Sequence, residues 1–188
     1  MPPQNKDEIY EKITGNFLLA RLNVKGIFER SVVWISAFAK DAGARGIIIN
    51  KPMMRRLAEC TPTFAGTPLA QIPMFAGGPV EENRLAVLAC IRNFLTGGNE
   101  IQIGLPPDKI RDLAHNPAAS LMAFAGHAEW QPGQLENEIA SGTWLHTRID
   151  FALWLNENPE NLWRKLLEQS KKLDAQILLR APLRLEEN

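Results

Sequence analysis

The chain has 188 residues, enough for one domain with a substantial core, and its 45% hydrophobic and 22% charged content is ordinary for a globular protein. Its 21 basic and 21 acidic residues balance, which argues against direct nucleic-acid binding, because such domains usually carry a basic excess or a clustered basic face. The apolar-rich run Ser31–Ala39 is far shorter than the roughly 20 residues that cross a bilayer, and the polar start lacks the apolar run of a secretory peptide. We therefore expect a cytoplasmic protein without a membrane segment, whose Cys60 and Cys90 are reduced thiols.

The first half of the chain predicts mainly strands. Residues 1–13 are polar and predict a flexible N-terminal arm. A short stretch with Gly43 and Gly46 favours a hairpin between the second and third strands. Residues Met53–Cys60 predict a brief helix, and the proline-rich stretch after them predicts a loop. Apolar, β-branched and aromatic residues predict the strands themselves at Phe17–Ala20, Ser31–Phe38 and Ile47–Ile49.

The second half predicts further strands interrupted by short helices, which indicates a single mixed α+β domain over residues 14–170. Helices are expected at Lys109–His115 and from Pro159 to about Gln169, where proline suits the first turn. Residues 171–188 are ambiguous, with a strand at Ile177–Leu179 as one interpretation. The expected strands are Met74–Ala76, Leu85–Ile91, Glu100–Leu105, Ala119–Ala125 and Thr143–His146.

The stretch WQPGQLENEIASG, which begins at Trp130, has the features of a helix start. Pro132 suits a first turn, and the side chain of Gln134 can reach back to the cap residue. Leu135 and Ile139 form an apolar i,i+4 pair. Gly142 can close the helix in a left-handed conformation.

Two acidic residues of this helix could suggest acid–base chemistry. Glu136 and Glu138 lie about 200° apart around a helix, so a dyad that shares a proton is not expected between them. Both carboxylates also lie near the positive end of the helix dipole, which stabilises them. On this interpretation only Trp130 and Gly133 lack a structural role.

Other chemical signatures are weak. Gly77–Pro79 is followed by two glutamates and lacks the GxxxxGK[ST] pattern, so it predicts a turn and not a phosphate loop. No GxSxG motif marks a nucleophile, and a solvated turn of helix explains the pair Arg55-Arg56 as well as a DNA-binding motif would. We predict no catalytic residue, metal site or cofactor, because the histidines lie 12 and 19 residues apart without a metal-binding spacing: His115, His127 and His146.

Three motifs occur in an order and at a spacing that resemble the YqgE/AlgH family of bacterial proteins. They are SVVWI…GARGIIINKP (Ser31–Pro52), FAGGPV (Phe75–Val80) and GHAEWQPGQLENEI…SGTWL (Gly126–Leu145). The resemblance covers roughly residues 13–170, and WxPGQLExE is its specific core. The chain departs from the family's GYAGWGPGQLE at His127, Glu129 and Gln131.

The resemblance chiefly implies a fold: one α+β domain whose bent, bifurcated and mostly antiparallel sheet forms a pseudo-barrel flanked by short helices. The family's name derives from a proposed role in transcriptional regulation of an exopolysaccharide, which need not mean direct contact with DNA. The resemblance carries over no catalytic residue.

We therefore expect a non-catalytic binding or interaction module with a regulatory role, whose protein or small-molecule partner is unknown. The first alternative is a hydrolase-like enzyme that uses Glu129 or Glu136 with His127, and the second is a transcriptional regulator that acts on DNA directly. The sequence does not predict an oligomeric state. The binding patch is expected where the motif segments converge, at Asn50, Gly77, Gly78, His127, Trp130, Gly133, Gln134 and Glu136.

Overall fold

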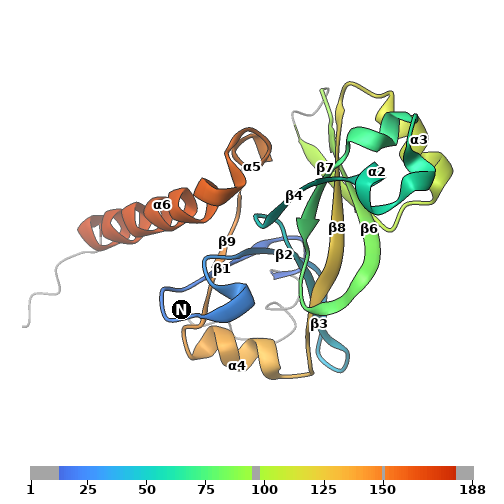
Figure 1. The fold of residues 1–188 in the computed structure, drawn as a ribbon. Coiled ribbons are helices and arrows are strands. Elements are labelled where there is room, and N and C mark those ends of the chain that lie inside the picture. The colour runs from blue at the N-terminus through green and yellow to red at the C-terminus, as the bar shows by residue number, and fades with distance from the viewer. Residues whose placement is uncertain (1–12, 95–97, 150, 181–188) are drawn as a thin grey trace, which may run out of the picture.

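One long strand, β8 (Ala119–Trp130), organises the sheet because it belongs to both of its branches (Figure 1). The computed structural model describes residues 13–94, 98–149 and 151–180. Its nine-stranded sheet is mixed and curls into a half-barrel with helices around it, so the expected α+β fold with a bifurcated sheet is confirmed. Within the described residues, no helix is both long enough and apolar enough to cross a membrane.

The first branch places four strands beside the C-terminal part of β8, all of them antiparallel to their neighbours. The expected hairpin is confirmed: Val33 lies opposite Ile48, and the register shifts between Ile35 and Ala37. From the outer edge inward the strands are β9 (Trp144–Thr147), β1 (Phe17–Ala20), β2 (Val32–Ala39) and β3 (Gly43–Ile48).

The second branch lies around the N-terminal part of β8. β5 runs parallel to β8 on one edge, whereas β6 runs antiparallel to it on the other. β4 then pairs with β5, and β7 pairs with β6. The strands are β4 (Pro52–Arg56), β5 (Pro73–Ala76), β6 (Val80–Arg92) and β7 (Asn99–Ile103).

The concave side of the curled sheet holds the main core, which α5 (Phe151–Asn156) and α6 (Pro159–Arg180) help to close. Alternate residues of a strand point to one face, so each strand contributes every second side chain to this core. The indole of Trp163 donates a buried hydrogen bond of 2.7 Å to the carbonyl oxygen of Ala20, which fixes α6 to β1. Core members from both branches and the helices include Phe17, Trp34, Ile47, Phe75, Leu88, Phe124 and Leu162.

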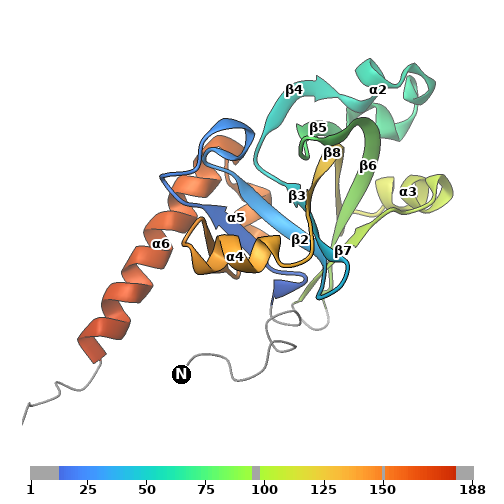
Figure 2. The same cartoon turned by 90° about the horizontal axis from the view of Figure 1, so that it is seen from below.

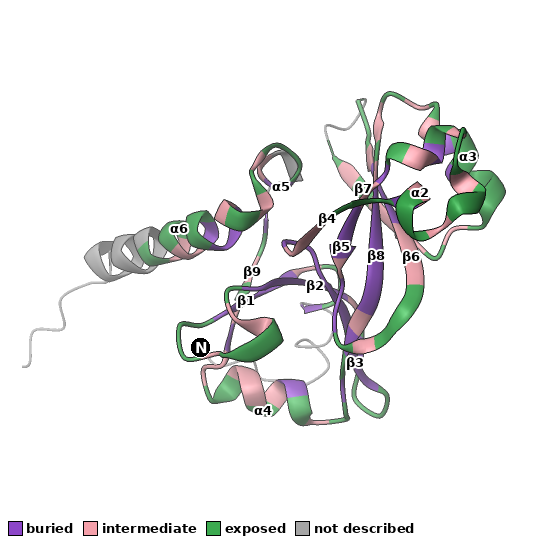
Figure 3. Cartoon of the chain, viewed as in Figure 1, coloured by how far each residue is buried: buried purple, intermediate pink, exposed green. Residues whose placement is uncertain are grey.

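Two smaller cores cover the other face of each branch. α4 (Gln134–Ala140) packs Leu135 on the first branch, which Figure 2 shows from below. α2 (Leu57–Cys60) and α3 (Pro107–Ala114) pack on the second branch. Buried residues therefore run along most of β2, β3 and β8 (Figure 3).

The structure corrects several local predictions. Only the end of Met53–Cys60 is helical, because Pro52 and Arg56 pair with β5 and draw this segment into the sheet. The expected loop after it contains the short 3₁₀ helices η2 (Pro62–Phe64) and η3 (Pro68–Gln71). A further 3₁₀ turn, η1 (Gly26–Phe28), precedes β2.

The C-terminal part also differs from its prediction. Ile177–Leu179 is helical and not a strand, since α6 has no glycine or proline after Pro159 and continues to Arg180. With 22 residues, α6 is an exception to the expected short helices. The expected arm at residues 1–13 lies outside the described residues except for Ile13, which is buried against the first branch. The tail at 181–188 also lies outside them.

Candidate functional site

The glycines of FAGGPV let two backbones cross at close range. A Cβ atom at Gly77 would lie 2.3 Å from the carbonyl oxygen of Gly126, and one at Gly78 would lie 2.2 Å from the carbonyl carbon of His127. Real Cβ atoms do not approach other atoms so closely. The backbone of Gly77 also donates to Ala125 and accepts from Ile48, at 2.7 and 2.8 Å. Both glycines are buried where the chain passes from β5 to β6.

A large bulge in β6 follows this crossing. Between Val80 and Leu85, β6 advances five residues while β8 advances only two, so the residues 81–84 loop away from the ladder. Glu81 has φ 52°, a left-handed conformation that costs a side-chain-bearing residue about 1–2 kcal/mol. Gly126 lies under the bulge with φ 73°, and a Cβ there would be 2.4 Å from the carbonyl oxygen of Gly78.

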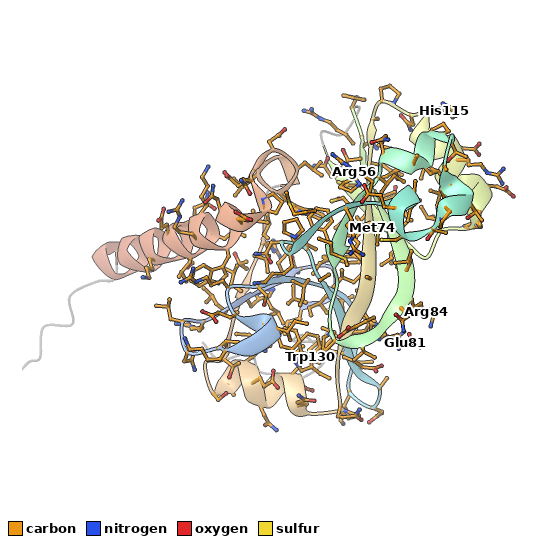
Figure 4. All side chains as sticks on the ribbon, in the orientation of Figure 1. Arg56, Met74, Glu81, Arg84, His115 and Trp130 are labelled. Carbon is orange, nitrogen blue, oxygen red and sulfur yellow. The ribbon has the colours of Figure 1, made fainter. Side chains whose placement is uncertain are left out.

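A cavity of about 350 Å³ lies next to this bulge. Ile47, Ala86 and Ile103 give it apolar walls, and Ile47 also belongs to the main core. Figure 4 shows Glu81 and Arg84 next to each other on the early part of β6. The polar lining comes from four strands or their ends and consists of Ser36, Arg45, Glu81, Arg84 and His127.

Two ion pairs hold the cationic side chains of this cavity. Arg45 Nη2 lies 3.0 Å from Glu129 Oε1, across the β3–β8 pair, and Arg84 Nη1 lies 3.0 Å from Glu81 Oε2. Both guanidinium groups are more than half exposed, at 56% and 75% of their side-chain surface. Exposed ion pairs of this kind contribute only about 0.2–1 kcal/mol each.

His127 is more enclosed than the charged side chains of the cavity, with 14% of its side-chain surface exposed. Its neighbours Ala128 and Trp130 belong to the core under α4, which fixes the direction of this part of β8. Its Nδ1 lies 3.9 Å from Glu81 Oε2, beyond hydrogen-bonding distance. Its Nε2 is buried, and among the described residues no hydrogen-bond partner reaches it. A buried polar nitrogen without a partner is costly, so a ligand or water that reached it would be favoured.

Trp130 and Gln134 have structural roles centred on Glu138. Trp130 Nε1 and Trp144 Nε1 both donate to Glu138 Oε2, at 2.9 and 2.7 Å. Gln134 Nε2 donates to Glu138 Oε1 at 2.8 Å, and Gln134 Oε1 accepts from the backbone N–H of Gln131 at 3.0 Å. Gln134 thus reaches back to Gln131 and not to the cap residue as expected, because Gly133 is the N-cap.

The ends of α4 show why its glycines are needed. Gly133 is the N-cap residue of α4 and has φ 79°, a left-handed conformation that favours glycine. It therefore has a structural role, which the sequence alone did not reveal. The helix begins one residue after it, and Pro132 lies outside the helix instead of in its first turn. At the other end Gly142 has φ 75° and donates to Ile139, while Thr143 donates to Glu138. These two bonds form the Schellman motif of a glycine-closed helix.

Asn50 holds a strained turn before β2. Its Oδ1 accepts from the backbone N–H of Val32 at 2.7 Å, and its Nδ2 donates to the carbonyl oxygen of Arg30 at 3.0 Å. Arg30 has φ 53°. Lys51 Nζ donates to the carbonyl oxygen of Glu29 at 2.6 Å, and burial lowers the pKa of this amine although the Glu29 carboxylate opposes the shift. A separate hollow of about 300 Å³ beside Asn50 and Lys51 is bordered by Glu160.

The carboxylates of the hydrolase alternative are not placed against His127. The side chain of Glu129 is 40% exposed and forms an ion pair with Arg45. Glu136 is a half-buried residue of α4, the helix that packs on the first branch of the sheet. A different carboxylate, that of Glu81, lies within 4 Å of His127. His115 and His146 are exposed, on the end of α3 and on β9. In the described part of the chain, no three His, Cys, Asp or Glu side chains gather as a metal site would require.

Of the eight expected patch residues, His127 lines the cavity, and Gly77 and Gly78 lie against Gly126 and His127 without lining it. The other five lie elsewhere, in cores, turns or α4: Asn50, Trp130, Gly133, Gln134 and Glu136. Sequence reasoning missed the polar lining contributed by Ser36, Arg45, Glu81 and Arg84. The sequence held only slight signals for these residues. Arg45 lies two residues before Ile47, so a strand would place both on one face. Charged residues also follow Gly78-Pro79, in a stretch that was not expected to belong to the strand beginning at Leu85.

Comparison with known proteins supports the resemblance. A family model described as AlgH-like matches residues 17–173. A UPF0301 protein of Methylococcus capsulatus is 30% identical over 185 residues, which cover 90% of this chain and 98% of that protein. A UPF0301 protein of Chlamydia felis is 29% identical over 160 residues, or 82% and 84% of the two chains.

Two solved structures share the fold. The solution structure of the AlgH protein from Pseudomonas aeruginosa aligns with a TM-score of 0.64 at 24% identity, over 92% of this chain and 93% of that one. The crystal structure of protein DIP2367 from Corynebacterium diphtheriae aligns with a TM-score of 0.61 at 22% identity, over 84% and 86%. The chain belongs to the AlgH-like family.

Proposed function

We propose that the protein is a non-catalytic binding module of the cytoplasm with a regulatory role, and that it binds a small molecule in the cavity beside the β6 bulge. The observation that carries this proposal is the cavity of about 350 Å³ that combines apolar walls with the side chains of Arg45, Arg84 and His127. Ligand pockets commonly have volumes of about 300–1,000 Å³, apolar walls and a few polar groups that orient the ligand.

The contacts of the polar groups favour binding over catalysis. The hydroxyl of Ser36 donates to the carbonyl oxygen of Arg45 at 3.1 Å, so it is not directed to His127 as a nucleophile would be. Glu129 is neutralised by Arg45, and Glu81 by Arg84. A catalytic histidine is commonly oriented by a hydrogen bond to a third group, whereas the Glu81 carboxylate lies 3.9 Å from His127 Nδ1, beyond hydrogen-bonding distance.

Regulation through direct DNA contact is less well supported. The chain has no basic excess, whereas phosphate-backbone binding requires several cations along one surface. A regulatory role is therefore assigned to the ligand-bound protein acting on a protein partner. Placement in the cytoplasm agrees with the unpaired Cys60 and Cys90, since Cys60 is exposed as a free thiol.

A thermal-shift screen of bacterial metabolites tests the proposal. A ligand that binds the folded state at 100 times its Kd should stabilise it by about 2.7 kcal/mol. The His127→Ala variant should lose this stabilisation. The His115→Ala variant should retain it, because His115 is exposed at the end of α3.

Each variant is compared with its own ligand-free state, so a change in basal stability does not obscure the result. Mass spectrometry of the recovered ligand should show it unchanged. Stabilisation that is equal in all three proteins, no stabilising compound at all, or conversion of the ligand into a product would each contradict the proposed function.

A further inference from the structure

We infer that the cavity selects small molecules that carry one anionic group, phosphate or carboxylate, next to a short apolar part, and that Arg45 and Arg84 bind the anion. This inference rests on the proposed function, because it names the ligand class of the same cavity. The two arginines belong to β3 and β6, both of which pair with β8, so they approach the cavity from different strands.

The charge of the lining favours an anion. The side chains that line the cavity include two guanidinium groups and one carboxylate, that of Glu81. Each guanidinium has five N–H donors in a planar fork, and the recorded ion pair of each arginine uses one nitrogen. Donors therefore remain for a phosphate or carboxylate, whose geometry the fork matches.

The existing ion pairs do not block such a ligand. Both lie at the surface, where water and salt weaken them, so each arginine can turn toward an anion at small cost. Glu129 and Glu81 then act as competitors for the two guanidinium groups. Removal of either carboxylate should consequently strengthen anion binding, which a purely structural role of the ion pairs would not produce.

The apolar walls of the cavity favour a ligand that has an uncharged, apolar part beside its anionic group. Ile47, Ala86 and Ile103 present apolar surface to the cavity. An inorganic anion alone would leave this surface in contact with water, whereas a short alkyl group would cover it. His127 lines the same cavity beside these apolar walls.

The test is a protein-observed NMR titration of the full chain with probes of matched size: n-butyl phosphate, pentanoate, n-butylamine, n-butanol and inorganic phosphate. Butyl phosphate should shift the signals of Arg45, Arg84 and His127 and bind at least about tenfold more tightly than the amine or the alcohol. Inorganic phosphate should bind more weakly than butyl phosphate.

Variants identify the groups that bind the anion. Arg45→Met and Arg84→Met should each weaken butyl phosphate binding about tenfold. Arg45→Lys should recover only part of the affinity, because a lysine keeps the charge without the fork. Glu81→Gln and Glu129→Gln should strengthen binding. Arg111→Met, which removes an exposed arginine of α3, is the matched control and should have no effect.

The outcomes separate this inference from the proposed function. If butanol or butylamine moves the cavity signals as strongly as butyl phosphate, the ligand class is wrong while a binding cavity remains. If the glutamine variants fail to strengthen anion binding, or Arg111→Met weakens it as much as the cavity variants do, the assignment to Arg45 and Arg84 is wrong. If neither these probes nor any metabolite moves the cavity signals, both proposals fail.

Discussion

The carboxylate of Glu138 accepts a hydrogen bond of 2.9 Å from the indole of Trp130, eight residues earlier in the chain. The same oxygen accepts a second bond from Trp144 at 2.7 Å, and the two indole rings meet edge to face with centroids 6.0 Å apart. Phe28 contacts both rings. The tryptophan of the WxPGQLExE motif is thus a core residue, and the second glutamate of the motif satisfies its N–H group.

Replacing Glu138 by alanine should lower the free energy of unfolding by about 2–4 kcal/mol, because it leaves two largely buried indole N–H groups without an acceptor. Urea denaturation followed by tryptophan fluorescence measures the change. Asn137→Ala, at an exposed position of the same helix, should have a free energy of unfolding within about 0.5 kcal/mol of the wild-type value. Equal effects of the two substitutions would show that the Glu138 contacts do not stabilise the fold.

Replacing Gly77 by alanine should destabilise the protein by about 3 kcal/mol or more, or prevent folding, since the new methyl group would collide with the backbone of Gly126. Gly66→Ala is the control, because a Cβ there meets no atom within 4 Å and only its φ of 75° is strained. The free energy of unfolding of Gly66→Ala should fall by only about 1 kcal/mol. A Gly77→Ala protein with wild-type thermal stability would refute the close crossing of the two backbones.

Replacing Asn50 by alanine should lower the free energy of unfolding by about 2–3 kcal/mol, because it removes both hydrogen bonds that the buried amide makes to the backbone around β2. Thermal unfolding should show the loss, and binding of cavity ligands to the folded variant should be unchanged. Weakened binding without loss of stability would instead place Asn50 in the binding site.

The two cysteines should differ strongly in reactivity. Cys60 is exposed, whereas Cys90 is buried and its burial raises the thiol pKa from 9.0 to about 11. At pH 8 roughly one Cys90 thiol in a thousand would be ionised, so a thiol reagent should label Cys60 rapidly and Cys90 only after unfolding. In Cys60→Ser, fast labelling of the native protein should disappear; its persistence would mean that Cys90 is accessible.

The raised pKa of Cys90 also makes the free energy of unfolding depend on pH. Because the folded state holds the proton more tightly, the contribution of this thiol is fully present below pH 9 and is lost as the pH rises toward 11. The stability difference between wild type and Cys90→Ala should therefore narrow over this range. A difference that stays constant with pH would contradict the assigned burial.

Local patterns predicted much of the fold. The glycine spacing identified the β2–β3 hairpin, and Gly142 identified the end of α4, whereas Pro132 was wrongly expected in its first turn. Predictions failed where distant contacts decide the outcome. Residues 52–56 join a sheet because β5 lies beside them. The sequence does not show that β6 pairs with β8 across a bulge, so β6 is longer than predicted.

The cavity could not be predicted for the same reason. Arg45 and Glu129 are far apart in the chain and meet only through the register of β3 on β8. Glu81 and Arg84 enter the site because the β6 bulge lifts them out of the ladder. The specific motif around Trp130 attracted the functional interpretation, but its conspicuous residues build the helix start and the core beneath it.

The most direct test of a binding cavity next to His127 is a ¹H–¹⁵N NMR titration with a metabolite that stabilises the protein in the thermal-shift screen. We expect saturable shifts at Ser36, Arg45, Arg84 and His127, with the metabolite recovered intact. Shifts that gather instead on α4 or around Asn50, with the cavity signals unmoved, would contradict the account.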